Sequence, residues 1–141
     1  MQNPDCGILL KQIDTLLAKR ANAAMKQAGV TLSQVTLLRV LAEQPQQRAE
    51  FKFVERELGV SQPTTAGLIA RLREKGLVTC CASPNTANAK VAQLTPAGQA
   101  VVEACEQDMR HEEEVIFAGF AADEREQLLA MLARVRANLG G

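Results

Sequence analysis

The stretch Phe51–Leu77, FKFVERELGVSQPTTAGLIARLREKGL, predicts two short helices joined by a tight turn. Val54 and Leu58 are one helical turn apart and can share a buried face, while Gly59 stands where the chain must turn with positive φ. We expect Val60 to fill the corner between the two helices. Such a helix-turn-helix constrains the fold more than any other feature, although the same residues alone also fit an ordinary helical hairpin in a packed core.

The second helix of this pair has a clear start and two distinct faces. Ser61 can cap it, and Pro63 in its first turn gives up an N–H that has no helical partner there. Leu68, Ile69 and Leu72 supply the buried stripe. The remaining positions of the helix are expected to face mostly outward: Gln62, Thr64, Ala66, Gly67, Arg71 and Arg73. Small and polar side chains on that face suit a helix that enters a DNA major groove.

A β-hairpin is predicted directly after the second helix. Gly76 ends the helix, and Leu77–Ala82 is a β-prone run. Ser83–Asn88 is rich in turn-forming residues, and Lys90–Leu94 alternates polar and apolar residues as a half-buried strand does. Thr95-Pro96 then begins another helix with a cap and a proline at its first position. A hairpin in this place is the wing of a winged helix.

At this point the chain resembles the MarR family of bacterial winged-helix transcription regulators. The matching segments are Leu32–Leu41 (LSQVTLLRVL), Glu57–Val78 (ELGVSQPTTAGLIARLREKGLV) and Leu94–Val102 (LTPAGQAVV), in the order and spacing of the family. The resemblance covers nearly the full length. It implies a mainly α fold with a small β-hairpin wing, in which one domain spans residues 1–141. Residues 31–94 form its winged helix-turn-helix, and residues 1–30 and 95–141 form a helical dimerisation platform.

The two ends of the chain carry apolar residues at helical spacing, as a platform requires. These stripes comprise Ile8, Leu9, Ile13, Leu16, Leu17, Ala24 and Ala28, then Val101, Val102, Cys105, Met109, Ile116 and Phe117, and finally Leu128, Leu132, Val135 and Leu139. Stripes of this kind are more often internal core than partner surface, but in the family these helices interleave with those of a second subunit. A symmetric dimer presents two recognition helices to adjacent major grooves, so the expected partner is double-stranded DNA with a pseudo-palindromic site.

A helix after residue 31 should connect the platform to the DNA-binding region. Thr31 and Gln34 fit a capping box ahead of the apolar positions of that helix. Its end is marked by Pro45, which lies in the polar stretch from Gln44 to Arg48. We expect a surface loop there and a short strand near Ala49 that completes the wing sheet.

The candidate DNA-binding residues come from the second helix and the wing. They are Ser61, Gln62, Pro63, Thr64, Thr65, Gly67, Arg71, Arg73, Lys75, Asn88 and Lys90. Family wings usually carry an acidic residue before the proline and a pair of arginines, one of which reaches the minor groove; here the pair is replaced by Ala87-Asn88. Affinity should therefore rest on the helix and on Arg71, Arg73 and Lys75. The alternative is that Asn85 or Asn88 contacts the groove without full charge, which would lower the affinity and its salt dependence.

Charge and composition leave a second interpretation open. The formal net charge is zero, although residues 50–94 carry six Lys and Arg against four Asp and Glu, whereas residues 95–141 carry four against nine. A DNA binder usually has a basic surplus, so a protein-interaction module with weak or lost DNA binding is the alternative. The absence of Trp and Tyr argues against single-strand binders that stack bases.

The four cysteines are expected to be reduced in a cytoplasmic protein. Cys105 lies on an apolar stripe, whereas adjacent Cys80 and Cys81 should point to opposite faces of a strand. Some members of the family sense oxidants through cysteine, so Cys6, Cys80 and Cys81 are candidate redox residues. The chain lacks the tyrosines that the hydroperoxide-sensing branch places around its N-terminal cysteine.

The sequence also bears on metal sites, enzyme active sites and membrane segments. The one histidine, His111, has Glu112 beside it and Asp108 one turn earlier, which we interpret as a solvated acidic face. We expect no enzyme, metal or cofactor, because no nucleophile–base motif is present. No apolar run reaches membrane-spanning length and no signal peptide is seen, so a cytoplasmic location is expected.

The resemblance also implies a small-molecule effector, because the family binds effectors in the crevice between platform and DNA-binding region. The apolar residues Ile13, Leu17, Leu37 and Met109 are the candidate lining. An effector bound there is expected to release a repressor by changing the separation of the two recognition helices.

Overall fold

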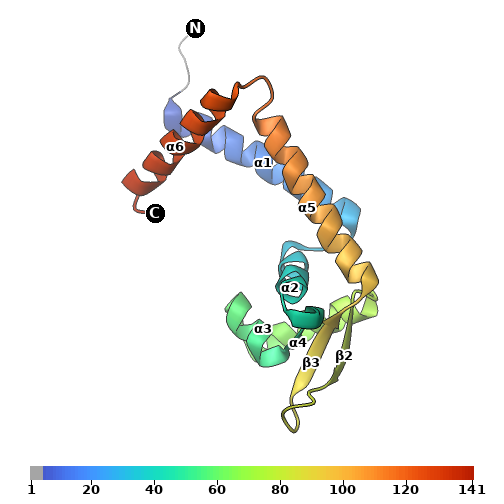
Figure 1. Ribbon diagram of the computed structural model, residues 1–141. Helices are drawn as coiled ribbons and strands as arrows, with labels where there is room; N and C mark the ends of the chain where they lie inside the picture. Colours follow the sequence, from blue (N-terminus) through green and yellow to red (C-terminus); the bar gives the residue numbers. More distant parts are fainter. Residues whose placement is uncertain (1–4) are drawn as a thin grey trace. The chain divides into compact units, whose positions relative to one another are not determined.

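The computed structural model describes residues 5–141 (Figure 1). Its elements are α1 (Cys6–Ala28), α2 (Leu32–Ala42), the 3₁₀ turn η1 (Pro45–Gln47), β1 (Arg48–Glu50), α3 (Phe51–Leu58), α4 (Gln62–Glu74), β2 (Val78–Ala82), β3 (Lys90–Leu94), α5 (Pro96–Ile116) and α6 (Ala122–Asn138). The chain divides into two compact units, and the division falls between Glu106 and Gln107, inside α5. The expected class, mainly α with a β-hairpin wing, is confirmed.

The first unit, which ends at Glu106, has one apolar core. Helices α2, α3 and α4 pack together and against the sheet. The fully buried large side chains are Leu37, Leu38, Leu41, Val54, Ile69, Leu72, Val78 and Val102. Because apolar burial is the main favourable contribution to folding, this cluster holds α4 in place relative to the wing.

The sheet has the strand order β1-β3-β2, and both pairings are antiparallel. Ala49 lies opposite Ala92, so the expected short strand near Ala49 is confirmed. The hairpin of β2 and β3 begins with Val78 opposite Leu94 and closes with Ala82 opposite Lys90. Figure 1 shows this hairpin projecting from the helices of the first unit.

The helix boundaries follow the signals in the sequence. Thr31 and Gln34 form the expected capping box, and the Ser61 hydroxyl accepts a hydrogen bond from the Thr64 N–H at 3.3 Å. Gly59 has φ 65°, a left-handed conformation that glycine adopts without strain. Val60, in contrast, is 37% exposed, so the prediction that it fills the corner is wrong. Val54, on the preceding helix, is fully buried in the core instead.

The start of α5 packs tightly against the beginning of β2. The Thr95 hydroxyl donates to the Gly76 carbonyl at 2.8 Å and accepts from the Gly98 N–H at 3.0 Å, so this predicted cap is confirmed. A Cβ atom at Gly98 would overlap the Leu77 carbonyl oxygen and lie 2.6 Å from Leu94 Cδ1. Glycine is therefore required there by close backbone approach.

The second unit, Gln107–Gly141, holds the end of α5 and all of α6. The turn between them is fixed by an edge-to-face contact of Phe117 and Phe120, with ring centroids 5.6 Å apart. Arg125 lies 4.7 Å from the Phe117 ring centroid and 3.8 Å from a Glu113 carboxylate oxygen. Within the described residues, no helix is both long and apolar enough to cross a bilayer.

Candidate nucleic-acid interface

One face of α4 is exposed from its first turn to its last. Gln62, Pro63, Thr64, Gly67 and Arg71 all lie on the surface. Ser61 also belongs to this surface, and its hydroxyl donates to Thr64 Oγ1 at 2.9 Å, which fixes both side chains at the N-terminus. A polar helix start with small residues behind it has the shape and chemistry that a major groove admits.

Thr65 does not belong to this face. Its side chain is fully buried, so its assignment to the DNA-binding set is wrong. The reason is helical spacing, because Thr65 precedes Ile69 by four residues and Leu72 by seven, and it therefore shares their inward face. The Oγ1 atom of Thr65 has no hydrogen-bond partner.

Lys75 lies on the surface, but its ammonium group is hydrogen-bonded to other residues of the chain. Its Nζ donates to the Gly29 carbonyl at 2.6 Å and to Gln34 Oε1 at 3.0 Å. These acceptors lie at the junction of α1 and α2, so the ammonium, which was predicted from the sequence to contact DNA, is hydrogen-bonded within the chain. Arg71 and Arg73 remain as exposed cations of α4.

The tip of the wing is small and almost uncharged. Its base is tied to the start of α3, because the Ser83 hydroxyl donates to Glu50 Oε1 at 3.0 Å. Asn88 has φ 66°, a left-handed conformation that asparagine tolerates better than most residues. Ala87 and Asn88 are both exposed, and Lys90 stands at the beginning of β3. The wing therefore offers mainly polar groups and one lysine to any partner.

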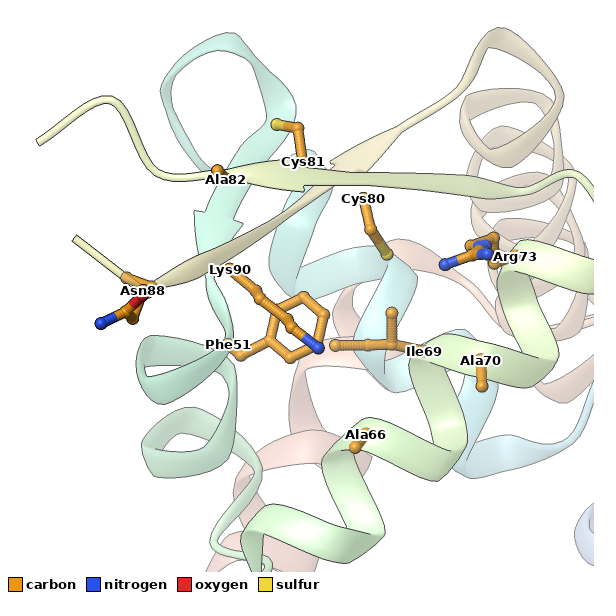
Figure 2. Close-up of a pocket in the computed structure, with 11 residues that line it drawn as sticks. Phe51, Ala66, Ile69, Ala70, Arg73, Cys80, Cys81, Ala82, Asn88 and Lys90 are labelled. Carbon is orange, nitrogen blue, oxygen red and sulfur yellow. The ribbon is translucent and has the colours of Figure 1, made fainter. Parts of the chain in front are cut away.

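A pocket of about 530 Å³ separates α4 from the wing. Figure 2 shows Ala66, Ile69, Ala70 and Arg73 on the α4 side and the two strands opposite. This pocket was not predicted from the sequence, although the alanines at 66 and 70, one helical turn apart, are a signal that could have indicated a hollow. Lys90 also lines the pocket, on the wing side. The pocket is thus flanked by two cations, Arg73 and Lys90, and both are candidates for the interface.

The four cysteines occupy different environments. Cys80 and Cys81 point to opposite sides of β2, as expected, and Figure 2 shows the Cys80 side chain turned toward α4. Cys80 is half-buried and Cys81 is exposed. Cys6 is exposed in the first turn of α1, and Cys105 is half-buried against the core.

The candidate effector residues are not equivalent in the structure. Leu37 has no exposed surface, because it is part of the core of the first unit, so it cannot offer a wall to a ligand as expected. Ile13 is exposed and Leu17 half-buried on α1, whereas Met109 lies in the second unit and is 54% exposed.

The acidic face around His111 is solvent-exposed. His111 Nδ1 lies 3.9 Å from a Glu114 carboxylate oxygen, and both side chains are largely exposed. Within residues 5–141, no three His, Cys, Asp or Glu side chains are grouped so that they could hold a metal ion.

Comparison with known proteins agrees with this geometry. Residues 28–87 match the model of the MarR family. An uncharacterized HTH-type transcriptional regulator of Bacillus subtilis, YybA, is 28% identical over 137 residues, which are 96% of this chain and 86% of the relative. The HTH-type transcriptional repressor Rv2887 of Mycobacterium tuberculosis is 25% identical over 130 residues, or 92% of this chain and 91% of the relative.

Solved structures of MepR from S. aureus have the same fold. A MepR–DNA complex superposes with a TM-score of 0.84 at 22% identity and covers 94% of this chain and 98% of MepR. MepR bound to ethidium bromide superposes with a TM-score of 0.79 at 22% identity, covering 96% and 97%. Resemblance at this identity concerns the fold alone.

Proposed function

We propose that the chain is a transcription regulator of the MarR family, and that it is a homodimeric, sequence-specific DNA-binding repressor released by a small-molecule effector. The observation that carries the proposal is the division of α4 into a buried apolar face and an exposed face of small, polar and basic residues. The exposed face enters the major groove of double-stranded DNA. The DNA-binding set is then Ser61, Gln62, Pro63, Thr64, Gly67, Arg71, Arg73, Asn88 and Lys90.

The homodimer is supported by apolar side chains that stay on the surface of α1, α5 and α6. Exposed examples include Ile8, Leu9, Ile13, Leu16, Met109, Val115, Ile116, Leu129, Met131 and Leu132. Exposed apolar patches larger than those of ordinary monomers mark protein interfaces. We assign residues 1–30 and 95–141 to the dimerisation platform and residues 31–94 to DNA binding. Two-fold symmetry then requires half-sites about one helical turn apart.

The proposals of repression and of release by an effector are supported by the similar proteins. Rv2887 is named a repressor, and MepR has been solved with both DNA and ethidium bromide. For this chain, an effector that contacts Ile13 or Leu17 on α1 favours a separation of the recognition helices that no longer matches the half-sites. The protein acts in the cytoplasm, where the DNA is.

Substitution of Arg71 tests DNA binding by this face. Arg71→Ala should weaken binding to the operator and lower the slope of log affinity against log salt by about 1 per protomer, because a phosphate contact is lost. Arg134→Ala on α6 removes the same charge away from the DNA-binding face and is the matched control, provided that its sedimentation matches that of the native protein. Equal affinities and slopes for both variants would refute the proposed interface.

The alternative, a protein-interaction module with weak or lost DNA binding, is favoured by the zero net charge and the wing without arginine. A module of this kind is indifferent to Arg71→Ala. A redox-regulated repressor is the other alternative, favoured by the Cys80 thiol in the pocket beside α4. That version requires peroxide to abolish DNA binding by the native protein and not by Cys80→Ser.

A further inference from the structure

Lys75 joins three elements that the sequence separates. It is the C-cap of α4, and its Nζ reaches back 46 positions along the chain to the Gly29 carbonyl, 2.6 Å away. The same Nζ donates to Gln34 Oε1 at 3.0 Å. One ammonium group therefore links the end of the recognition helix to the end of α1 and the start of α2.

The acceptors of Lys75 belong to a well-defined junction. Gly29 ends α1 with φ 74°, and its N–H donates to the Lys26 carbonyl, while the Val30 N–H donates to the Met25 carbonyl. Gln34 is 3% exposed, and its Oε1 also accepts the Thr31 N–H at 3.2 Å as part of the capping box. The junction is therefore ordered by its own hydrogen bonds before Lys75 is added.

Electrostatics favour an ammonium at this place. The C-terminal ends of α1 and α4 both carry partial negative charge from their unpaired carbonyls, and a cation is stabilised near each. A lysine Nζ has three donors and can serve both acceptors at once. Apolar groups cannot replace this link, because they offer no donor to the Gly29 carbonyl.

We infer that Lys75 is a positioning residue for DNA recognition, which fixes the orientation of α4 relative to α1 and does not contact phosphate. The inference rests on the proposed function, because orientation of α4 matters only if that helix reads DNA. Lys75 then belongs to the contacts that couple the platform helix α1 to the recognition helix α4, and not to the DNA-binding face. In a dimer, the direction of α1 then influences the spacing of the two recognition helices.

The test compares Lys75→Met with Arg71→Met in the full-length protein. Methionine keeps an unbranched apolar side chain and removes the charge and the donors in both variants. Binding to the operator and to the same duplex with one base pair added between the half-sites is measured by fluorescence anisotropy across several salt concentrations. Lys75→Arg keeps a charged donor and tests rescue, and a melting curve of each variant confirms that it is folded at the assay temperature.

Positioning predicts three results for Lys75→Met. Operator affinity falls roughly fivefold, within the usual range of coupling between sites. The salt slope stays that of the native protein, whereas Arg71→Met lowers it by about 1 per protomer. The preference for the correct spacing over the extended one is reduced, and Lys75→Arg restores part of it.

Other outcomes overturn the inference. A lower salt slope for Lys75→Met would show that Lys75 contacts a phosphate. Weaker binding with an unchanged spacing preference makes it a stabilising residue only, and unchanged binding removes any role. Failure of the native protein to prefer any operator over scrambled DNA is a different result, because it refutes the proposed function itself.

Discussion

Thr65 buries a hydroxyl without a hydrogen-bond partner in the middle of α4. A buried polar group left unpaired loses its hydration without compensation. Thr65→Val replaces that hydroxyl by a methyl group of similar size, so we expect the free energy of unfolding to rise by about 1 kcal/mol. Urea denaturation followed by circular dichroism measures the change.

The buried position of Thr65 also predicts that Thr65→Val leaves DNA binding unchanged. Operator affinity of Thr65→Val should equal that of the native protein, because the side chain is buried beneath the DNA-binding face. Thr64→Val is the matched control, since Thr64 is exposed and bonded to the Ser61 hydroxyl. A loss of affinity in Thr65→Val with unchanged stability contradicts the placement of Thr65 in the core.

At the scale of single residues, the sequence predicts what depends on near neighbours. The caps at Thr31, Ser61 and Thr95 follow from residue types a few positions apart, and all three occur in the structure. The burial of Thr65 could also have been found from its spacing to Ile69. The bond from Lys75 to residue 29 could not, because no local pattern encodes a contact over such a separation.

At the scale of elements, two glycines on helices should respond oppositely to the same substitution. Gly98→Ala should lower the free energy of unfolding by about 2 kcal/mol or more, because the added Cβ overlaps the Leu77 carbonyl where α5 meets β2. Gly67→Ala should raise it by about 0.5–1 kcal/mol, since alanine is the better helix former and nothing lies within 4 Å of that Cβ. Thermal melts of both variants test the pair.

The two glycine substitutions also distinguish effects on stability from effects on DNA binding. Gly67 lies on the exposed face of α4, so Gly67→Ala should weaken operator binding if the backbone approaches the groove closely. A variant that is more stable and binds DNA less well fits the interface as assigned. A Gly98→Ala variant as stable as the native protein contradicts the packing described at Gly98, and destabilisation by Gly67→Ala contradicts the open space at Gly67.

The wing offers a gain-of-function test. Ala87→Arg places a cation on the exposed tip of the hairpin, which otherwise carries no charge. We expect tighter operator binding and a salt slope that is steeper by about 0.9 per protomer, because one more phosphate is neutralised. Ala87→Gln is the control for side-chain size. An unchanged slope in Ala87→Arg means that the wing tip does not approach the DNA backbone.

The limits of sequence reasoning differ between elements. The strands Val78–Ala82 and Lys90–Leu94 were predictable from their alternation and the turn residues between them. The size of the pocket between α4 and the wing was not, because Ala66 and Ala70 indicate only a hollow beside α4, and its extent depends on how a helix and a hairpin pack across the core. Leu37 was misassigned for the same reason: apolar spacing identifies a buried face without saying what covers it.

At the scale of the whole molecule, the platform should govern assembly. Leu16 on α1 is 61% exposed, and Leu16→Glu should shift the protein from dimer to monomer at micromolar concentration, because a charge in an apolar interface is costly. Leu32→Glu is the matched control, since Leu32 is 66% exposed at the start of α2, outside the proposed platform. Analytical ultracentrifugation measures both, and monomers from neither or from both variants would contradict the assigned platform.

The most direct test of the account is fluorescence anisotropy of the purified, reduced protein on the intergenic DNA beside its own gene. The titration is repeated across several salt concentrations, with a scrambled duplex of the same composition as control. A DNA-binding regulator should prefer the intergenic site as a dimer, with an affinity that falls steeply as salt rises. Binding no tighter than to scrambled DNA at every salt concentration would contradict the central claim and support a protein-interaction module instead.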